Sequence, residues 1–131
     1  MSERSVYDTR FFIEYFYSKN LEFLKKLKED LKRVRGKVVS VLTIHEVYRI
    51  SLEKEGRDVA DLRGKIICKD FKVVNVDYDV AVRSAELRSK YRIPMADSVI
   101  AATAQMHKCT LASDDPHFKQ VQDIKVRWFN T

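Results

Sequence analysis

The sequence has few of the residues that break secondary structure, form linkers or cross-link a chain. Its 131 residues include three glycines, two prolines and two cysteines. So few glycines and prolines favour helices joined by short connections and leave no linker, so we expect a single domain over residues 1–131. The two cysteines lack a metal-binding spacing and cannot form a disulfide framework. We expect Cys68 and Cys109 to be buried thiols in a reducing compartment.

Long apolar runs are also missing. None approaches the roughly 20 residues that span a membrane, and the N-terminal segment carries charge where a signal peptide would be apolar. We therefore expect a cytoplasmic protein with no membrane contact. The net charge of +6 permits an anionic partner. Much of the excess lies in residues 24–37, whose leucines recur at helical spacing, so this stretch is either the solvated face of a helix or a nucleic-acid surface.

The chain does contain a regular alternation of strand and helix patterns. Short apolar runs typical of buried parallel strands cover residues 5–7, 37–42, 71–76, 109–112 and 125–129. Helical patterns cover residues 9–19, 20–34, 44–56, 57–69, 77–91 and 95–108. This alternation predicts an α/β fold, a three-layer α/β/α sandwich with a mostly parallel central sheet of about five strands.

Acidic residues recur where the expected strands end and helices begin, which is where open α/β sheets bind ligands. Asp8 follows the first strand, Glu46 follows the second, Asp97 opens a late helix, and Asp114 and Asp115 follow the fourth strand. Carboxylates that converge there would repel one another unless a cation neutralised them, and oxygen ligands suit Mg²⁺ or Mn²⁺. The histidines, His45, His107 and His117, are scattered and form no pair with metal-ligand spacing.

Helix capping is the competing explanation for most of these acids. Asp8 and Asp115 stand where N-caps would stand, and Thr43 and Glu46 have the spacing of a capping box. Asp97 is different. With Pro94 at the first helical position it would be the fourth residue of its helix, too late to cap, and a charge among apolar neighbours needs a partner.

Three segments carry these acids: VYDTRFFIEYF at residues 6–16, VVSVLTIHEVYRI at 38–50, and SAELRSKYRIPMADSVIAATAQMHKCTLASDDPHF at 84–118. They resemble PIN-domain ribonucleases, and within them the toxin subunits of VapBC-type toxin–antitoxin pairs. The late family motif, Thr–any–Asp–any–any–Phe, places Ser113 at the threonine, Asp115 at the acid and Asp114 at a variable position. Two departures are Arg10, where a small polar residue is common, and Lys108–Cys109 in place of the usual glycine.

The resemblance implies a metal-dependent endoribonuclease that is often a homodimer and is blocked by a small antitoxin. Asp8, Asp97 and Asp115 would hold Mg²⁺ or Mn²⁺, and Glu46 would bind a second ion, hold a water or orient the nucleophile. Thr9 and Ser113 are expected to orient the carboxylates. Water would be the nucleophile, leaving 5′-phosphate and 3′-hydroxyl ends. Candidate phosphate contacts are Arg10, Lys19 and Arg49.

The sequence is also compatible with other interpretations. The chain could be a PIN nuclease of RNA processing rather than a toxin, or a PIN-fold binding module without catalysis. A Mg²⁺-binding signalling domain of the receiver type would want paired acids after the first strand and a lysine after the last, and here the acid pair comes late. The aromatic-rich stretch at residues 11–24 is either core alone or core plus a surface for an antitoxin or a second subunit.

Overall fold

The computed structural model describes residues 3–129 and centres on a five-stranded parallel sheet. The strand order is β3-β2-β1-β4-β5, and every neighbouring pair is parallel. The strands are β1 (Arg4–Tyr7), β2 (Gly36–Ser40), β3 (Lys72–Val74), β4 (Thr110–Ala112) and β5 (Val126–Arg127). The predicted fold class is confirmed.

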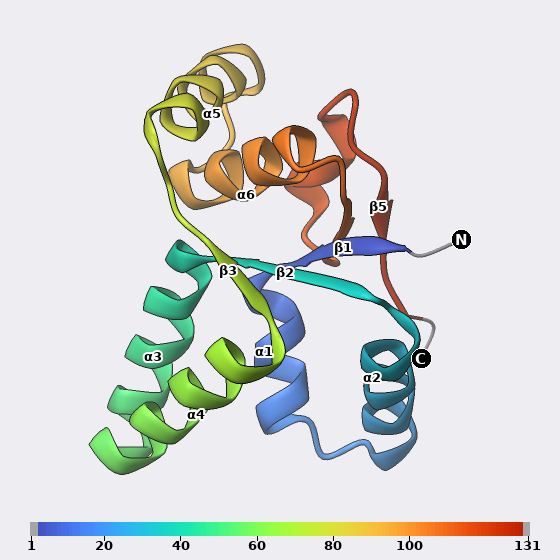
Figure 1. The fold of residues 1–131 in the computed structure, drawn as a ribbon, viewed down its shortest axis with the longest axis vertical. Coiled ribbons are helices and arrows are strands. Elements are labelled where there is room, and N and C mark those ends of the chain that lie inside the picture. The colour runs from blue at the N-terminus through green and yellow to red at the C-terminus, as the bar shows by residue number, and fades with distance from the viewer. Residues whose placement is uncertain (1–2, 130–131) are drawn as a thin grey trace.

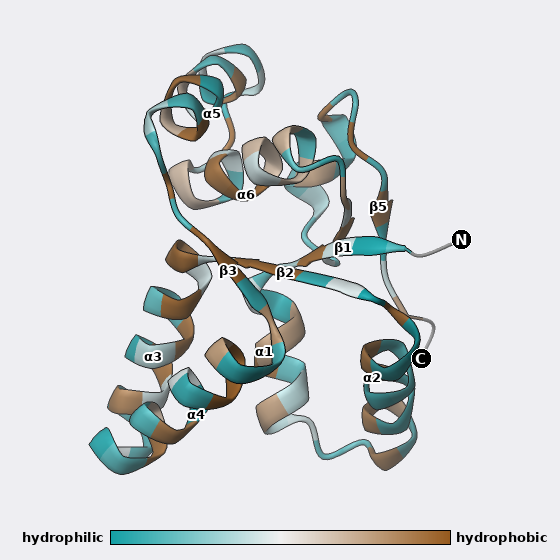
Figure 2. Ribbon diagram, in the orientation of Figure 1, coloured by the Kyte–Doolittle hydropathy of each residue, from teal (hydrophilic) through white to brown (hydrophobic). Residues whose placement is uncertain are grey.

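Helices cover both faces of the sheet (Figure 1). One layer contains α1 (Thr9–Tyr17), α2 (Leu21–Arg33), α3 (Val41–Glu55) and α4 (Arg57–Asp70), and the other contains α5 (Tyr78–Tyr91), α6 (Met95–Met106) and the 3-10 helix η1 (Pro116–Gln120). Successive strand residues alternate between the layers, as the pleat requires. Val6 and Val38 pack with the α5 and α6 residues, whereas Tyr7 and Val39 pack with α1 and α2. Figure 2 shows the resulting apolar centre and the hydrophilic outer faces of the helices.

The point where the chain changes direction along the sheet lies between β1 and β4. From β1 the chain moves outward through β2 to β3, and it then returns to place β4 on the other side of β1. Such a switch point opens a crevice at the carboxyl ends of the two strands, since the connections leave in opposite directions. Tyr7 pairs with Ala112 at this edge, so the residues that follow both strands start side by side.

Helix α3 begins earlier than the sequence pattern predicts. The apolar run expected to continue as a strand to residue 42 ends at Ser40, whose Oγ accepts a hydrogen bond from the Leu42 backbone N–H at 3.2 Å. Thr43 therefore lies inside α3, where it is fully buried, and it is not an N-cap. The capping-box explanation for Glu46 is thus wrong. Strands β3 and β5 are also shorter than predicted.

The structure also tests the expected burial of the cysteines and of the aromatic-rich stretch. Cys109 is buried, but Cys68 is exposed on α4, so its predicted burial is wrong: it lies on the solvent side of that helix, while Ile67 points into the core. The aromatic-rich stretch is largely core, because Phe11, Phe12 and Phe23 are all buried.

Helix α2 is amphipathic, with Leu27 buried and its lysines outside. Within residues 3–129 no helix is long and apolar enough to cross a membrane.

A buried ion pair ties β5 to α2 and β1. Asp30 of α2 has 3% of its side chain exposed and lies 2.7 Å from Arg127 Nη1 of β5. The Tyr7 hydroxyl donates to the same carboxylate at 2.7 Å, and Arg33 adds a contact at 2.9 Å. Burial, followed by the nearby Asp30 carboxylate, raises the pKa of Tyr7, so the phenol stays protonated and remains a donor. This cluster anchors the edge strand to the rest of the fold.

Candidate metal-binding active site

The four predicted acids all lie at the carboxyl-terminal edge of the sheet. Asp8 follows β1 and Asp115 follows β4, on the two sides of the switch point. Asp97 lies in the first turn of α6, as its third residue rather than the fourth, because Pro94 is the N-cap. Glu46 is in the second turn of α3. The topology therefore brings together acids that are separated by up to 107 positions in the sequence.

Asp8 is buried at the centre of this group. The Ser113 hydroxyl donates to Asp8 Oδ2 at 2.7 Å, and Ser113 Oγ accepts from the Asp115 backbone N–H at 3.1 Å. Burial raises the pKa of Asp8 to about 6, and the negative charges of Asp115 and Glu46 add to this, while hydrogen bonds from Ser113 and the Thr9 backbone oppose it. Asp8 is the N-cap residue of α1, but apart from the contact with the Thr9 backbone its side chain forms no capping bond within the described residues, so the cap explanation does not account for its carboxylate.

Asp97 and Asp115 meet at His117. The His117 Nδ1 atom lies 2.8 Å from Asp97 Oδ2 and 2.9 Å from Asp115 Oδ1, and ligand atoms of all three residues lie within 4.8 Å of one another. Burial raises the pKa of Asp97 to about 6, the charges of Asp115 and Asp8 raise it further, and His117 opposes the shift. Asp115 also caps η1, since its Oδ1 accepts from the His117 backbone N–H at 2.9 Å.

Sequence reasoning missed His117. The three histidines are scattered in the sequence, yet the structure gathers His117 with two of the predicted acids. The available signal was its place two residues after Asp115, across the proline that begins η1. Its other partner, Asp97, is 20 residues away, and no local spacing connects the two.

Glu46 is held beside the buried acids by Thr9. The Thr9 hydroxyl donates to Glu46 Oε1 at 3.2 Å, which joins the start of α1 to α3. Both hydroxyls that were expected to orient carboxylates, Thr9 and Ser113, therefore hydrogen bond to members of the acidic group. Such contacts fix the direction in which a carboxylate presents its oxygens.

The two adjacent aspartates have different surroundings. Asp114 forms a two-point ion pair with Arg10, with Arg10 Nε 2.8 Å from Asp114 Oδ1 and Arg10 Nη2 3.1 Å from Asp114 Oδ2. The Asp114 side chain is 31% exposed and the Arg10 side chain is 56% exposed. Asp115, in contrast, contacts His117 and lies with Asp97. Only one of the pair faces the acidic group.

The three residues expected to contact phosphates are less well placed near the acidic group than two other arginines. Arg10 pairs with Asp114, Arg49 pairs with Glu53 at 3.2 Å, and exposed Lys19 lies beyond the end of α1. A cavity of about 600 Å³ instead places Arg88 and Arg92 beside His117. The sequence does not indicate either arginine, because Arg88 in the last turn of α5 and Arg92 at its C-cap come beside His117 only through the packing of the helices.

The donor set fits a divalent cation. The charge of Asp115 adds to the raised pKa of both Asp8 and Asp97, and Asp8 adds to that of Asp97, so the site carries a repulsion that a bound cation would relieve. Carboxylate oxygens are the ligands of Mg²⁺ and Mn²⁺, and the imidazole of His117 is a donor that Mn²⁺ accepts more readily than Mg²⁺. The arrangement can therefore hold a cation next to an anionic substrate, with Glu46 and His117 available to exchange protons.

Comparison with known proteins gives a consistent result. The model of one family, described as the PIN domain, matches residues 5–124. A toxin–antitoxin complex from Klebsiella pneumoniae contains a similar chain with 24% identity and a TM-score of 0.74, covering 92% of this chain and 94% of that one. No curated protein matches the chain.

Two further solved structures are similar over nearly their whole length. VapBC2 from Rickettsia felis, bound to a promoter DNA fragment, gives a TM-score of 0.80 with 14% identity over 96% of this chain and 98% of that one. VapC20 from Mycobacterium tuberculosis, a Sarcin-Ricin loop cleaving toxin, gives 0.77 with 15% identity over 94% and 98%. At these identities the likeness establishes the fold, while the family match covers most of the sequence.

Proposed function

The chain belongs to the PIN domain family, and from that premise we propose that it is a metal-dependent endoribonuclease and the toxin of a toxin–antitoxin pair. The observation that carries the proposal is the convergence of Asp8, Asp97 and Asp115 at the switch point of the sheet. A group of carboxylates that share burial and repulsion needs a cation, and a cation beside a basic pocket attracts a phosphodiester. VapC20, one of the similar structures, is named as a toxin that cleaves the Sarcin-Ricin loop, which supports RNA as the substrate.

Asp8, Asp97 and Asp115 would hold Mg²⁺ or Mn²⁺. When bound, such an ion lowers the pKa of a coordinated water and stabilises negative charge on the phosphate oxygens. Ser113 keeps Asp8 in place through its 2.7 Å hydrogen bond. Glu46, held by Thr9 at 3.2 Å, would orient the attacking water and accept its proton. His117 contacts both Asp97 and Asp115, and it could join the ligands or deliver a proton to the leaving oxygen.

The expected reaction is direct hydrolysis. The oxygen of water forms a bond to phosphorus, the bond from phosphorus to the 3′ oxygen breaks, and that oxygen takes a proton. The products would carry 5′-phosphate and 3′-hydroxyl ends, and the 2′-hydroxyl would take no part. Arg88 and Arg92, beside His117, are the best placed cations for the phosphates that flank the cleaved bond.

The chain offers a matched pair of variants for testing this site. We expect Asp115→Asn and Asp8→Asn to lower cleavage of an RNA panel in Mn²⁺ or Mg²⁺ by more than a hundredfold. Asp114→Asn should stay within about threefold of the unmodified protein, because Asp114 pairs with Arg10 outside the acidic group. EDTA should abolish cleavage. Undiminished cleavage by Asp8→Asn would refute the mechanism, and no cleavage by any form would favour a binding module without catalysis.

The proposed partner is a small antitoxin protein. Several of the similar structures are complexes of a toxin with its antitoxin, including the Klebsiella pneumoniae and Rickettsia felis examples. Large apolar side chains are exposed on α3 and α4, namely Val41, Leu52 and Leu62, and they would suit an apolar peptide face. An adjacent reading frame whose product suppresses cleavage would support the toxin role, whereas its absence would favour a nuclease of RNA processing. We also propose a homodimer, to be tested by light scattering.

A further inference from the structure

A second charged surface lies at the amino-terminal ends of the strands, at the opposite edge of the sheet from the acids. Arg4, Gly36 and Lys72 open β1, β2 and β3, and they line one cavity of about 430 Å³. An adjoining cavity of about 570 Å³ extends it onto α2 and shares Lys37, Lys69, Asp70 and Phe71 with the first. We call the two cavities the basic groove. Its cationic residues are Arg4, Lys28, Lys32, Arg35, Lys37, Lys69 and Lys72.

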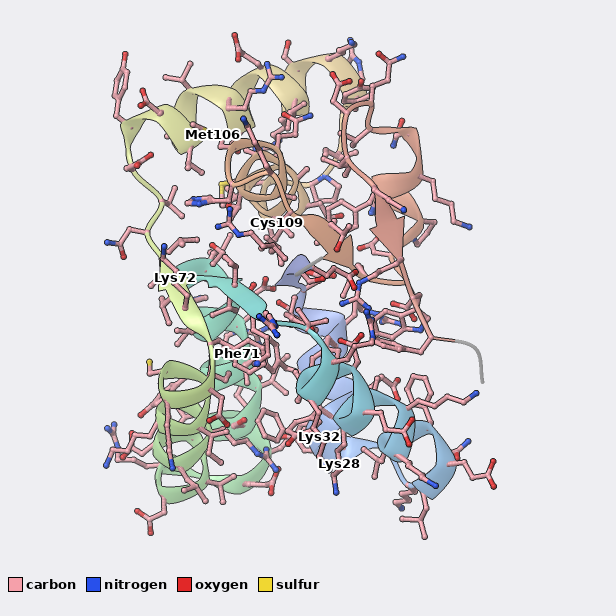
Figure 3. All side chains as sticks on the ribbon, turned by 45° about the vertical axis from the view of Figure 1, so that its right-hand side comes forward. Lys28, Lys32, Phe71, Lys72, Met106 and Cys109 are labelled. Atoms are coloured by element: carbon pink, nitrogen blue, oxygen red, sulfur yellow. The ribbon has the colours of Figure 1, made fainter. Side chains whose placement is uncertain are left out.

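The basic groove holds most of the unbalanced charge of the protein. Seven cations line it against one acid, Asp70, a difference equal to the whole net charge of +6. Figure 3 labels four residues from this side, Lys28, Lys32, Phe71 and Lys72. The cations come from the strand ends, from α2 and from the end of α4, so the fold assembles the groove and no single helix accounts for it.

The cations of the groove are also not neutralised by neighbouring acids. Six of the seven are exposed, and among residues 3–129 none of those six forms a salt bridge. Lys37, the seventh, donates to the Val34 carbonyl at 3.1 Å. Elsewhere arginines are paired, as in Arg10 with Asp114 and Arg63 with Glu55. Clustered like charges raise the local potential and attract a polyanion.

Gly36 lets Arg4 take its place in the groove. A Cβ atom at position 36 would lie 2.7 Å from Arg4 Cγ and 3.2 Å from Arg4 Cβ, so the Arg4 side chain lies against the start of β2 where only glycine leaves room. The glycine has an ordinary backbone conformation, because the positive-φ glycine among the described residues is Gly56. Its role here is therefore space for the arginine, not backbone freedom.

We propose that the basic groove binds the phosphate backbone of structured RNA and anchors the substrate away from the acidic group. The inference rests on the proposed ribonuclease function. The acidic group itself repels RNA, so binding energy has to come from cations elsewhere. An acidic peptide fits less well, since the apolar residues of the groove are buried or half-buried and offer little anchor: Phe71 is 8% exposed. Repeated phosphates match dispersed single cations, which bind them as point charges.

The position of the groove sets which RNAs can use it. The residues from Arg4 to Asp8 are in or directly after β1, so the groove lies about 13 Å from the acidic group through the protein. The path around the surface is longer. A hairpin of several base pairs can reach both, whereas a trinucleotide that occupies the acidic group is too short to reach the groove. The groove would therefore favour long or structured RNA over short fragments.

The test compares two charge reversals in the inactive Asp8→Asn background. Lys69→Glu with Lys72→Glu changes the groove. Lys54→Glu with Arg57→Glu makes the same change of charge about 18 Å away, around the opposite end of α4. Binding of a 40-nucleotide hairpin is followed by fluorescence anisotropy between 50 and 200 mM salt. We expect at least tenfold weaker binding and a shallower salt dependence for the groove variant only. Circular dichroism checks that both variants fold.

Each outcome decides between explanations. Equal hairpin affinity of the two variants would overturn the proposal, and so would a polyglutamate peptide that binds the groove of the unreversed protein when RNA does not. In the active protein, groove reversal should raise KM for the hairpin, leave kcat unchanged and spare a trinucleotide substrate. If the active protein cleaves nothing while hairpin binding still depends on Lys69 and Lys72, the ribonuclease function fails and the groove stands.

Discussion

The Ser113 hydroxyl donates a 2.7 Å hydrogen bond to Asp8 Oδ2 and so joins the ends of β4 and β1. Residues 105 positions apart meet here because the sheet reverses its direction of growth between these strands. The bond stabilises the ionised carboxylate, and it opposes the burial that raises the Asp8 pKa. One short contact therefore sets both the orientation and the charge of a proposed metal ligand.

Removing this hydroxyl should weaken the site without unfolding the protein. We expect Ser113→Ala to lower Mn²⁺ affinity and RNA cleavage by about 10- to 100-fold, since a metal ligand loses the group that orients it. Ser113→Thr keeps the hydroxyl, and it should retain cleavage within a few-fold. Isothermal titration with Mn²⁺ and a cleavage assay measure the two effects. Equal losses in both variants would show that side-chain volume, rather than the hydrogen bond, matters at this position.

The acidic group should make the metal-free protein less stable at neutral pH. In the folded state the pKa of Asp8 is about 6, against 3.8 for an ordinary aspartate. The folded state thus keeps a proton that the unfolded chain has lost, and stability present below pH 3.8 is lost as pH rises through 6. The difference corresponds to about 3 kcal/mol.

The Asp8→Asn variant tests this dependence. In EDTA we expect it to unfold at a higher urea concentration than the unmodified protein at pH 7.5, with a gain of up to about 3 kcal/mol. At pH 4 the two proteins should agree within about 1 kcal/mol, because Asp8 is then protonated in the folded state and still partly protonated in the unfolded chain. Parallel pH profiles would mean that Asp8 titrates normally. Mn²⁺ should stabilise the unmodified protein and have less effect on the variant.

Substitution in the buried pair of Asp30 and Arg127 should lower the unfolding free energy far more than substitution of an exposed neighbour. Removing the carboxylate by Asp30→Ala leaves the Tyr7 hydroxyl without its acceptor and Arg127 with contacts such as those to Ser5 and Glu3, and we expect a loss of about 3–5 kcal/mol in unfolding free energy. Glu29→Ala, one residue earlier and exposed, should cost less than about 0.5 kcal/mol. Urea denaturation at pH 7 measures both. A similar small cost for the two variants would show that water replaces the buried pair.

Lys108 occupies a backbone conformation that favours glycine. Its φ of 54° lies in the left-handed region, in the turn between α6 and β4 where the family usually has glycine. We expect Lys108→Gly to raise the unfolding free energy by about 0.5–1 kcal/mol, because it relieves the clash of Cβ with the backbone. Lys108→Ala retains that clash and should not stabilise. A gain in the alanine variant would trace the effect to the lysine side chain instead.

The expected alternation of strands and helices followed from local patterns, and it agrees with the structure because those patterns record which faces are buried. The ends of the elements were less predictable. The run through Leu42 looks like a strand to its end, but Ser40 caps α3 and turns the chain two residues earlier. A local hydrogen bond of this kind competes with strand pairing, and an apolar run does not reveal which wins.

Some residues of the candidate site could likewise be predicted from the sequence, and others could not. Asp8, Glu46, Asp97 and Asp115 could be named from the sequence, since each stands near a strand end or a helix start. The family motif predicts Asp115 at the acid and Asp114 at a variable position; in the structure Asp114 pairs with Arg10, whereas Asp115 lies with Asp97 and His117. Arg88 and Arg92 could not be named, and for His117 only its place two residues after Asp115 was available, because the contact with Asp97 and the position of the arginines depend on how α5, α6 and η1 pack around the acids.

The sequence by itself determined the fold class and the set of acids, because periodic burial and strand-end carboxylates are local features of a chain. Only the tertiary structure decided which side chains meet. It joined Ser113 to Asp8, gave His117 to Asp97 and Asp115, and gathered Arg4, Lys69 and Lys72 into the basic groove. Those contacts span distant positions, and they depend on the order of parallel strands in the sheet, which no short stretch of sequence specifies.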